Sequence, residues 1–422
     1  MPKTFKALEL APQLETAVAA NGFTEPTPIQ LKAIPLVRQG CDLLAAAQTG
    51  TGKTAAFVLP MLQKIIDRPT VYEKRVPRFL ILTPTRELAA QVAETITSLG
   101  KSIGVRSAVV FGGVGINPQK AAVAKGCDFL VATPGRLLDM LGQKMVELGH
   151  THVLILDEAD RMLDMGFLPD LKRILKVLPQ DRQTLLFSAT FSPEIRKLAS
   201  EFLNHPESVE IERNKDSGLV RQTLYKVPKT EKHTVLRDLI VDNRWDQVLV
   251  FTRTKYGADK LVRQLTKDGL QTKAIHGDKS QAARTSALKA FKEHTLPILV
   301  ATDIAARGLD IEKLPQVVNY ELPQQAEDYV HRIGRTGRAG ETGEAFSLIS
   351  PEELPQLKAI EKFIKKPLPL SDFPGLDVSS WKEAISQKPA ARSRSVKRGN
   401  PANKKKTGAP SGSRPQRKKQ TA

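Results

Sequence analysis

Cysteine is scarce in this sequence, since Cys41 and Cys127 are the only two among 422 residues. Two cysteines cannot build a framework of disulfides, and neither lies in a CxxC pair of the kind that binds zinc. We therefore expect two small packed residues in a reducing compartment and no disulfide. No apolar run reaches the roughly 18 residues that a membrane helix needs, and Met1–Leu10 is charged rather than typical of a signal peptide. These absences favour a cytoplasmic protein with no membrane partner.

Acidic residues are missing from the end of the chain. Residues 388–422 carry twelve Lys and Arg and no Asp or Glu, and they account for most of the net charge of +19. The segment also has no aromatic residue, so it cannot bury enough apolar surface to offset chain entropy. We expect a disordered basic tail that attracts phosphate backbones without reading their sequence. A solubilising tail without a specific partner and a nuclear-targeting signal are the alternatives.

Two blocks of the chain repeat a pattern of short apolar, β-branched runs followed by helical stretches. Continuous apolar strands that alternate with helices indicate parallel sheets covered on both faces. The first block contains the expected strands 42–46, 79–83, 108–111, 129–132, 153–156 and 184–187, and the second contains 248–251, 272–275, 298–301, 317–319 and 345–349. We therefore expect two tandem α/β domains at 1–212 and 221–365, a polar hinge at 213–220, an extension at 366–387 and the basic tail.

A phosphate-binding loop follows the first expected strand, where residues 45–54 read AAAQTGTGKT. Glycines let the backbone N–H groups face a phosphate, and the following helix adds its positive N-terminal end. Lys53 can reach the outer phosphates, and the Thr54 hydroxyl can hold Mg²⁺. Ala47 replaces the usual first glycine of the motif, so a chance Gly-rich turn is the alternative. The residues expected to bind the nucleotide here are Gln48, Thr49, Gly50, Thr51, Gly52, Lys53 and Thr54.

Two adjacent carboxylates end the apolar strand at 153–156. Ligands bind at the carboxyl ends of strands in open α/β sheets, which is where Asp157 and Glu158 fall. Asp157 suits the coordination shell of Mg²⁺, and Glu158 suits a general base that polarises the attacking water. An acidic strand end that merely caps the next helix is the alternative. The upstream Lys53 and Thr54 favour the catalytic interpretation.

Residues 157–160 spell DEAD, and from this point the chain resembles the DEAD-box RNA helicases. The similarity extends over about residues 5–340, with the motifs of that family in order. The segments GFTEPTPIQ, LDEADRMLDMGF, QVLVFTRTK and EDYVHRIGRTGRAG are most similar to the bacterial RhlE-type branch. The resemblance implies two tandem RecA-like domains that bind ATP and Mg²⁺. It also implies an RNA-stimulated ATP hydrolase that unwinds RNA.

The resemblance assigns further residues to the ATP site. Gln30 would read the adenine edge, since its amide both donates and accepts, and Phe23 would stack on the ring. Without the resemblance, Phe23 is more often a core residue. Arg335 and Arg338 would act as arginine fingers on the γ-phosphate, with Gly308 and Asp310 near the nucleotide and its ribose.

The resemblance also implies a coupling network and an RNA path over both domains. Hydroxyls of the Ser188-Ala189-Thr190 segment would hydrogen-bond Asp160, and His331 would join them. The expected RNA contacts bind phosphates and sugars and leave base edges unread, so we expect little base specificity. They are Thr85, Arg86, Gly113, Thr133, Arg136, Arg253, Arg284 and Thr302.

These assignments predict an ATP-dependent RNA helicase that closes two domains on a bent strand and so unwinds short duplexes or remodels RNA–protein complexes. Two rivals remain open: an ATP-locked RNA clamp or scaffold that hydrolyses slowly, and a DNA helicase of the same superfamily. Gln30 disfavours a GTPase. By resemblance alone, a role in ribosome assembly or RNA turnover follows, with ribosomal particles or RNA-decay proteins as partners.

Overall fold

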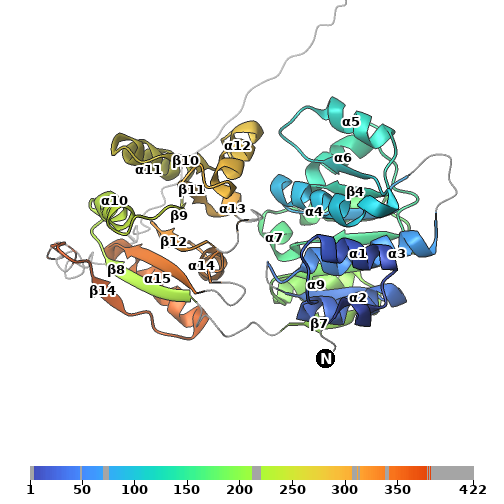
Figure 1. The fold of residues 1–422 in the computed structure, drawn as a ribbon, viewed down its shortest axis with the longest axis horizontal. Helices are drawn as coiled ribbons and strands as arrows, with labels where there is room; N and C mark the ends of the chain where they lie inside the picture. The colour runs from blue at the N-terminus through green and yellow to red at the C-terminus, as the bar shows by residue number, and fades with distance from the viewer. Residues whose placement is uncertain are drawn as a thin grey trace, which may run out of the picture.

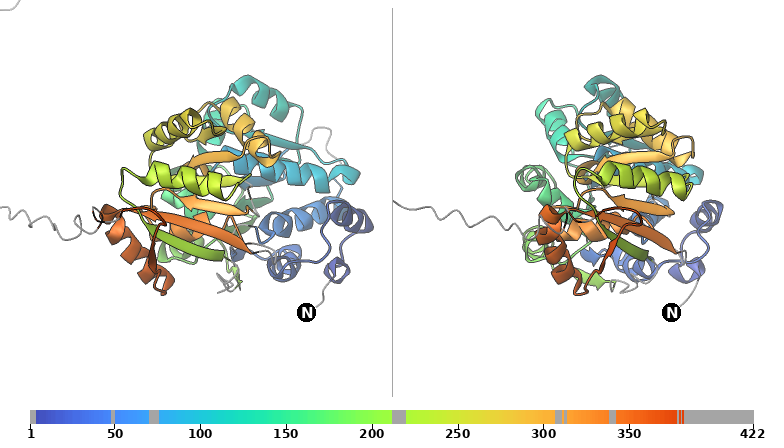
Figure 2. Two further views of the ribbon diagram at one scale, coloured as in Figure 1. Left: turned by 60° about the vertical axis from the view of Figure 1, so that its left-hand side comes forward. Right: turned by 90° about the vertical axis from the view of Figure 1, so that its left-hand side faces the viewer.

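The computed structural model describes residues 4–47, 50–69, 76–211, 220–306, 311, 314–337, 342–377, 379 and 381. Within these residues the strands form two sheets, in which every neighbouring pair is parallel. The sheets lie side by side in Figure 1, with the first (blue to green) on the right. The views of Figure 2 bring the second sheet and its helices in front of the first. The predicted α/β class with parallel sheets is confirmed.

The first sheet has the spatial order β3-β4-β2-β5-β6-β1-β7, and the second has the order β10-β11-β9-β12-β13-β8-β14. The strands of the first are β1 Leu43–Ala46, β2 Phe79–Leu82, β3 Ser107–Val110, β4 Phe129–Ala132, β5 Val153–Leu156, β6 Gln183–Ser188 and β7 Glu207–Glu210. The strands of the second are β8 Val220–Lys226, β9 Val248–Thr252, β10 Thr272–Ile275, β11 Ile298–Thr302, β12 Gln316–Asn319, β13 Gly343–Ile349 and β14 Leu370–Asp372.

Helices connect these strands and cover both faces of each sheet. Around the first sheet they are η1 Phe5–Leu8, α1 Pro12–Ala20, α2 Pro28–Gln39, α3 Lys53–Asp67, α4 Arg86–Leu99, η2 Lys101–Ile103, α5 Ile116–Ala124, α6 Pro134–Gly142, α7 Ala159–Asp164, α8 Leu168–Leu175 and α9 Pro193–Phe202. Around the second they are α10 Lys232–Asp242, α11 Lys255–Lys267, α12 Gln281–Lys292, α13 Asp303–Ala306, α14 Ala326–Ile333, η4 Pro351–Glu353 and α15 Leu354–Ile364.

Successive side chains of the central strands point to opposite faces of the first sheet, so each face has its own hydrophobic core. In β2 and β5 the odd-numbered residues face one core with α1 to α4, and the even-numbered residues face the other with α6 to α9. Phe79 packs on Phe129 in the first of these cores, with ring centroids 4.7 Å apart. Because both faces are covered, each position of a central strand is apolar, which explains why continuous apolar runs mark these strands.

The eleven predicted strands are all present, three with the predicted ends and eight with ends displaced by at most two residues. Three strands were not predicted: β7, β8 and β14. Val220, which we expected in the hinge, opens β8 because it pairs with Gly343. The predicted extension contributes β14, which pairs with β8, and the Trp381 indole donates a hydrogen bond to the Ile349 carbonyl.

Within the described ranges, the helices are all too short or too polar to cross a bilayer. Cys41 and Cys127 are free thiols, and burial raises the pKa of Cys127 to about 12. The predicted basic tail at 388–422 and most of the predicted hinge lie outside the described residues.

Candidate functional site

The carboxyl edge of the first sheet divides into two halves. The phosphate loop, the DEAD segment and Ser188-Ala189-Thr190 follow the neighbouring strands β1, β5 and β6. The residues predicted to contact RNA follow β3, β4 and β2 on the other half. Ligands bind at the carboxyl ends of the strands in open α/β sheets. The topology therefore separates a nucleotide region from an RNA region on one edge.

The phosphate loop joins β1 to the N-terminus of α3. Gly50 and Gly52 have φ of 79° and 86°, which the loop needs and which glycine adopts without strain. Lys53 is only 6% exposed, and its Nζ has no hydrogen-bond partner among the described atoms. A buried ammonium without a partner fits a site for phosphate oxygens. Gln48 and Thr49 lie outside the described residues, while Thr51 and Thr54 flank Lys53 in the loop and first helical turn.

Gln30 connects the predicted adenine motif to the phosphate loop. Its Oε1 accepts a hydrogen bond from the Thr27 backbone N–H at 2.9 Å, and its Nε2 donates to the Gly52 carbonyl at 3.1 Å. A Cβ at Gly52 would come within 2.5 Å of that nitrogen. The amide that we expected on adenine thus holds the loop in this structure. Phe23, predicted to stack on adenine, is 37% exposed rather than part of the core.

Asp157 and Glu158 are both buried at the carboxyl end of β5. Burial raises the pKa of Asp157 to about 6. Burial would also raise the pKa of Glu158, but the charges of Arg161, Lys53 and Arg335 outweigh it and hold that pKa below its ordinary value. Glu158 is therefore an ionised acceptor in the cavity, while Asp157 is a desolvated carboxylate that a cation would stabilise.

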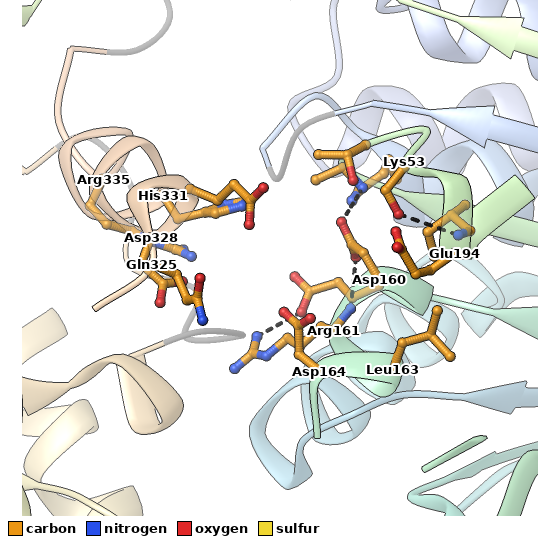
Figure 3. A pocket seen from close by; sticks show the side chains of 16 residues that line it. Lys53, Asp160, Arg161, Leu163, Asp164, Glu194, Gln325, Asp328, His331 and Arg335 are labelled. Carbon is orange, nitrogen blue, oxygen red and sulfur yellow. Dashed lines mark hydrogen bonds and ion pairs between the residues drawn. The ribbon is translucent and has the colours of Figure 1, made fainter. Parts of the chain in front are cut away.

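Arg161 is a site residue that the sequence analysis missed. It lies three residues after Glu158 on α7, is buried, and its Nη1 contacts Glu158 Oε2 at 2.7 Å. The (i, i+3) spacing on one helical face is the signal that could have found it. Figure 3 shows Arg161 at the cavity beside Asp160 and Asp164.

The predicted coupling segment does contact Asp160, but through the backbone. The Ala189 N–H donates to Asp160 Oδ2 at 2.9 Å. The Ser188 hydroxyl instead donates to the Thr190 carbonyl at 2.8 Å, which closes a local turn after β6. Among the described residues, the hydroxyls that we expected on Asp160 therefore do not bond it, and the buried Ser188 hydroxyl is already used within the turn.

A cavity of about 540 Å³ lies between the two sheets. Lys53, Glu158 and Arg161 line it from the first sheet, and His331 and Arg335 line it from α14 and the turn that follows (Figure 3). Arg335 is close enough for its charge to act on the pKa of Glu158. The cavity thus gathers the predicted residues from both halves of the chain. The predicted nucleotide residues Gly308, Asp310 and Arg338 lie outside the described residues.

The predicted RNA residues lie along the carboxyl edges of both sheets. Thr85 and Thr133 are the N-cap residues of α4 and α6, and Arg136 donates to the Val114 carbonyl at 3.0 Å. In the second sheet, Thr302 ends β11 and Arg253 follows β9, where its guanidinium lies 3.7 Å from Glu321. N-cap hydroxyls, free helix N-termini and arginines are the usual partners of a phosphate backbone.

Four side chains, two of them predicted RNA contacts, join the two sheets directly. Arg284 Nη2 contacts Glu87 Oε1 at 2.9 Å, and both side chains are about nine-tenths buried. Gln281 Nε2 donates to the same oxygen at 3.0 Å, and Arg86 Nη1 donates to Gln281 Oε1 at 3.3 Å. The Arg86 guanidinium also packs on Gly113, where a Cβ would come within 2.1 Å of Nη1. Two predicted RNA residues, Arg86 and Arg284, therefore belong to a contact between sheets, which the sequence analysis did not foresee.

A second missed interaction fixes the last turn of α14. The Arg332 guanidinium donates to both carboxylate oxygens of Asp303, at 2.5 and 2.7 Å, and to Asn319 Oδ1 at 3.0 Å. This fork-shaped pairing holds the helix that carries His331 and leads to Arg335 against the ends of β11 and β12. Its effect is to position the second half of the cavity.

Residues 27–198 match the family described as DEAD/DEAH box helicase, and residues 231–340 match the helicase conserved C-terminal domain. The chain is 43% identical over 383 residues to the ATP-dependent RNA helicase CshA of Listeria monocytogenes, covering 90% of this chain and 72% of that protein. It is also 43% identical over 375 residues to the DEAD-box ATP-dependent RNA helicase CshA of Geobacillus kaustophilus, covering 89% and 79%.

Among solved structures, the chain is similar to Saccharomyces cerevisiae Dbp5 bound to RNA and ADP BeF3, with a TM-score of 0.79 and 31% identity over 91% of this chain and 98% of that chain. A Dbp5 variant in the same complex also gives 0.79, whereas that variant bound to Nup159, Gle1, IP6 and ADP gives 0.61. Sequence identity is nearly the same in the two cases, at 31% and 30%, so the difference in TM-score comes from the conformation and not from the sequence similarity. By sequence, fold and site, this chain belongs to the DEAD-box ATP-dependent RNA helicases, which hydrolyse ATP to unwind RNA.

Proposed function

We propose that this enzyme unwinds short RNA duplexes by closing its two domains around ATP and one RNA strand. The observation that carries the proposal is the cavity of about 540 Å³, whose charged lining comes from both sheets. A nucleotide that contacts both Lys53 and Arg335 binds best when the sheets are close together. ATP then shifts the equilibrium toward the closed form by its differential affinity for that form.

Within this cycle we assign the chemistry to three charged groups. Glu158 accepts a proton from the attacking water, since it is ionised and faces the cavity. Lys53 and Arg335 stabilise the charge that develops on the transferred phosphoryl group. Arg338, which follows Arg335 in the same motif, is proposed as a second finger. Asp160 accepts a hydrogen bond from the Ala189 N–H. Through this bond, a change at the nucleotide cavity would move the turn after β6 and so affect RNA binding.

We further propose that Asp157 and Thr54 hold Mg²⁺. The support is a carboxylate that is fully buried and carries a raised pKa, because a nearby divalent cation would favour its charged form. A threonine hydroxyl at the start of α3 is the usual second ligand in a phosphate loop. Bound Mg²⁺ would neutralise part of the phosphate charge.

In this proposal, RNA binds tightly only to the closed arrangement of the two domains. The higher TM-score with the RNA and ADP BeF3 complex of Dbp5 supports the idea that the present structure is near that arrangement. ADP with BeF3 is a chemical mimic of ATP. The buried contact of Arg284 with Glu87 supports it too, since this pair exists only when the sheets approach. Strand separation would follow because a duplex cannot adopt the bent path.

The finer assignments remain our proposals. Segments such as LDEADRMLDMGF support the RhlE-type branch, although the relatives reported above carry the name CshA. We propose domains at 1–212 and 221–365 joined by a hinge near 213–220, with the basic tail as an RNA-attracting segment. A cytoplasmic location and work on ribosomal particles or in RNA turnover are proposed from the family resemblance.

A distance measurement between domains tests the cycle. One fluorophore on each domain should report a shorter distance only when ATP and single-stranded RNA are both present. Glu158→Gln should close in the same way and stay closed, with turnover lowered about 10²- to 10⁴-fold. Glu94→Gln, which changes an exposed glutamate on α4, is the matched control and should behave as wild type. An unchanged distance with both ligands would refute closure.

A further inference from the structure

A buried glutamine lies beside the RNA region of the first sheet. Gln119, on α5, is only 8% exposed. Its Oε1 accepts a hydrogen bond from the Phe111 N–H at 2.9 Å, and its Nε2 donates to the Phe111 carbonyl at 3.0 Å. The same nitrogen donates to the Gly115 carbonyl at 3.3 Å. The amide therefore uses its acceptor and both of its donors on backbone groups.

These bonds extend the pairing of an edge strand. β3 is the outermost described strand of the first sheet, with β4 on its paired side. Phe111 follows directly after β3, and its N–H and carbonyl groups bond the Gln119 amide in the way that they would bond a neighbouring strand. A side-chain amide offers the same donor and acceptor as a peptide group. Gln119 thus fixes where β3 ends and where the next loop begins.

The loop that Gln119 fixes comprises residues 112–115 and joins β3 to α5. It contains Gly113, a predicted RNA contact, whose φ of 77° favours glycine. A Cβ at Gly113 would come within 2.1 Å of Arg86 Nη1, so the loop lies directly against that side chain. Gln119 bonds both ends of the loop, because Phe111 precedes it and Gly115 ends it. The loop is therefore held at both ends and packed in the middle.

Arg136, another predicted RNA contact, takes its orientation from this loop. Its Nη2 donates to the carbonyl of Val114, which lies between the two residues that Gln119 bonds, at 3.0 Å. Its Nε lies 3.6 Å from Asp139 Oδ2, beyond hydrogen-bond distance. Its Nη1 has no hydrogen-bond partner among the described atoms. The position of the Val114 carbonyl thus decides where the rest of this guanidinium points.

We propose that Gln119 is a positioning residue for RNA binding, which holds the loop at 112–115 so that Arg136 binds a phosphate of the strand. This inference rests on the proposed function, because it takes Arg136 to be an RNA contact. The Gln119 amide is buried and already bonds the backbone, so its effect on RNA affinity passes through Arg136. The alternative is a purely structural glutamine, which would stabilise the first domain without changing any phosphate contact.

The salt dependence of RNA binding tests this role, because its slope reports how many phosphates the protein neutralises. Gln119→Met keeps the length of the side chain and removes its hydrogen bonds without changing any charge. With an ATP analogue present, we expect single-stranded RNA to bind about tenfold more weakly and with a slope lower by about one, as loss of one arginine–phosphate contact implies. The RNA concentration for half-maximal ATPase should rise by the same factor, while the maximal rate should change less than about twofold. Gln13→Met, which changes an exposed glutamine on α1, is the matched control and should bind RNA as wild type.

A double variant shows whether Gln119 acts through Arg136. Arg136→Gln alone should lower the slope by about one, and adding Gln119→Met should lower it no further, because the contact is already lost. Additive effects, or a wild-type slope in Gln119→Met, would overturn the positioning role. A wild-type slope and affinity in Arg136→Gln would overturn the proposed RNA contact, and this inference with it. Gln119→Asn, a neutral amide that is one carbon shorter, should lose the same slope and replaces Gln119→Met if that variant does not fold.

Discussion

The buried contact between Arg284 and Glu87 should control how strongly ATP and RNA favour each other. The pair has a 2.9 Å ion contact and joins the two sheets, so in the proposed cycle it forms only in the closed arrangement. Glu87→Gln keeps the shape of the side chain but removes the charge that Arg284 faces. Arg284 would then stay buried beside a neutral amide, and Gln281 would lose a charged acceptor.

Removing one member of a buried ion pair at an interface costs about 2–5 kcal/mol. The retained amide can still accept a hydrogen bond, so we expect about 2 kcal/mol, the low end of that range. This free energy belongs to closure rather than to the stability of either domain. RNA affinity in the presence of an ATP analogue should therefore fall about 30-fold, while RNA affinity without nucleotide should change less than about threefold.

RNA titrations with and without the analogue measure both quantities for Glu87→Gln, Arg284→Gln and the double variant. A coupling energy of about 2 kcal/mol is expected from this cycle, because either substitution alone already breaks the pair. Glu201→Gln, which disrupts the exposed contact with Lys172 inside the first domain, is the control and should have an effect below about 1 kcal/mol. If each single variant weakens RNA binding equally with and without the analogue, Arg284 is simply an RNA contact and the reasoning is refuted.

Three further predictions concern the nucleotide side and the tail. Arg161→Ala should lower kcat about tenfold with little change in KM, because Glu158 loses the group that orients it, and Arg161→Lys should recover part of the rate in steady-state ATPase assays. Because burial raises the pKa of Asp157 to about 6, its contribution to the free energy of unfolding is most favourable below about pH 4 and is lost as pH rises through about 6. Asp157→Asn should therefore gain up to about 3 kcal/mol relative to wild type between pH 4 and 7 in urea unfolding, and an unchanged difference would show that Asp157 is not desolvated. Deletion of 388–422 should flatten the salt dependence of RNA binding while leaving RNA-stimulated ATPase largely intact; an unchanged slope would show that the tail does not contact RNA.

Central strands were predictable because burial on both faces requires an apolar residue at every position. β7, β8 and β14 were not, since these strands lie at or next to a sheet edge and carry polar residues. The sequence of β8, VRQTLYK, has no continuous apolar run, although it pairs with β13 along its whole length. Its strand conformation comes from tertiary pairing, which overrides local composition.

The proposed catalytic groups were predictable from their residue types and their place after a strand, but their hydrogen-bond and ion-pair partners were not. Glu158 follows β5 as expected. Its contact with Arg161, however, occurs with a left-handed backbone at Glu158, where φ is 53°, and no local sequence pattern predicts that conformation. Likewise the amide of Gln30 suits adenine, yet here it bonds the Gly52 carbonyl. A side chain with several hydrogen-bonding options takes the one that tertiary structure supplies.

The contact between sheets was beyond sequence analysis for a different reason. Gln281 and Glu87 are 194 residues apart, and each lies in a motif that also suits RNA binding. In the structure, Arg86 both packs on Gly113, a predicted RNA contact, and donates to Gln281 of the other sheet. The same side chain thus faces the predicted RNA path and the contact between sheets. If the proposed closure is correct, RNA binding and closure are one equilibrium, and thermodynamic linkage requires that RNA tighten ATP binding by the same factor by which ATP tightens RNA binding.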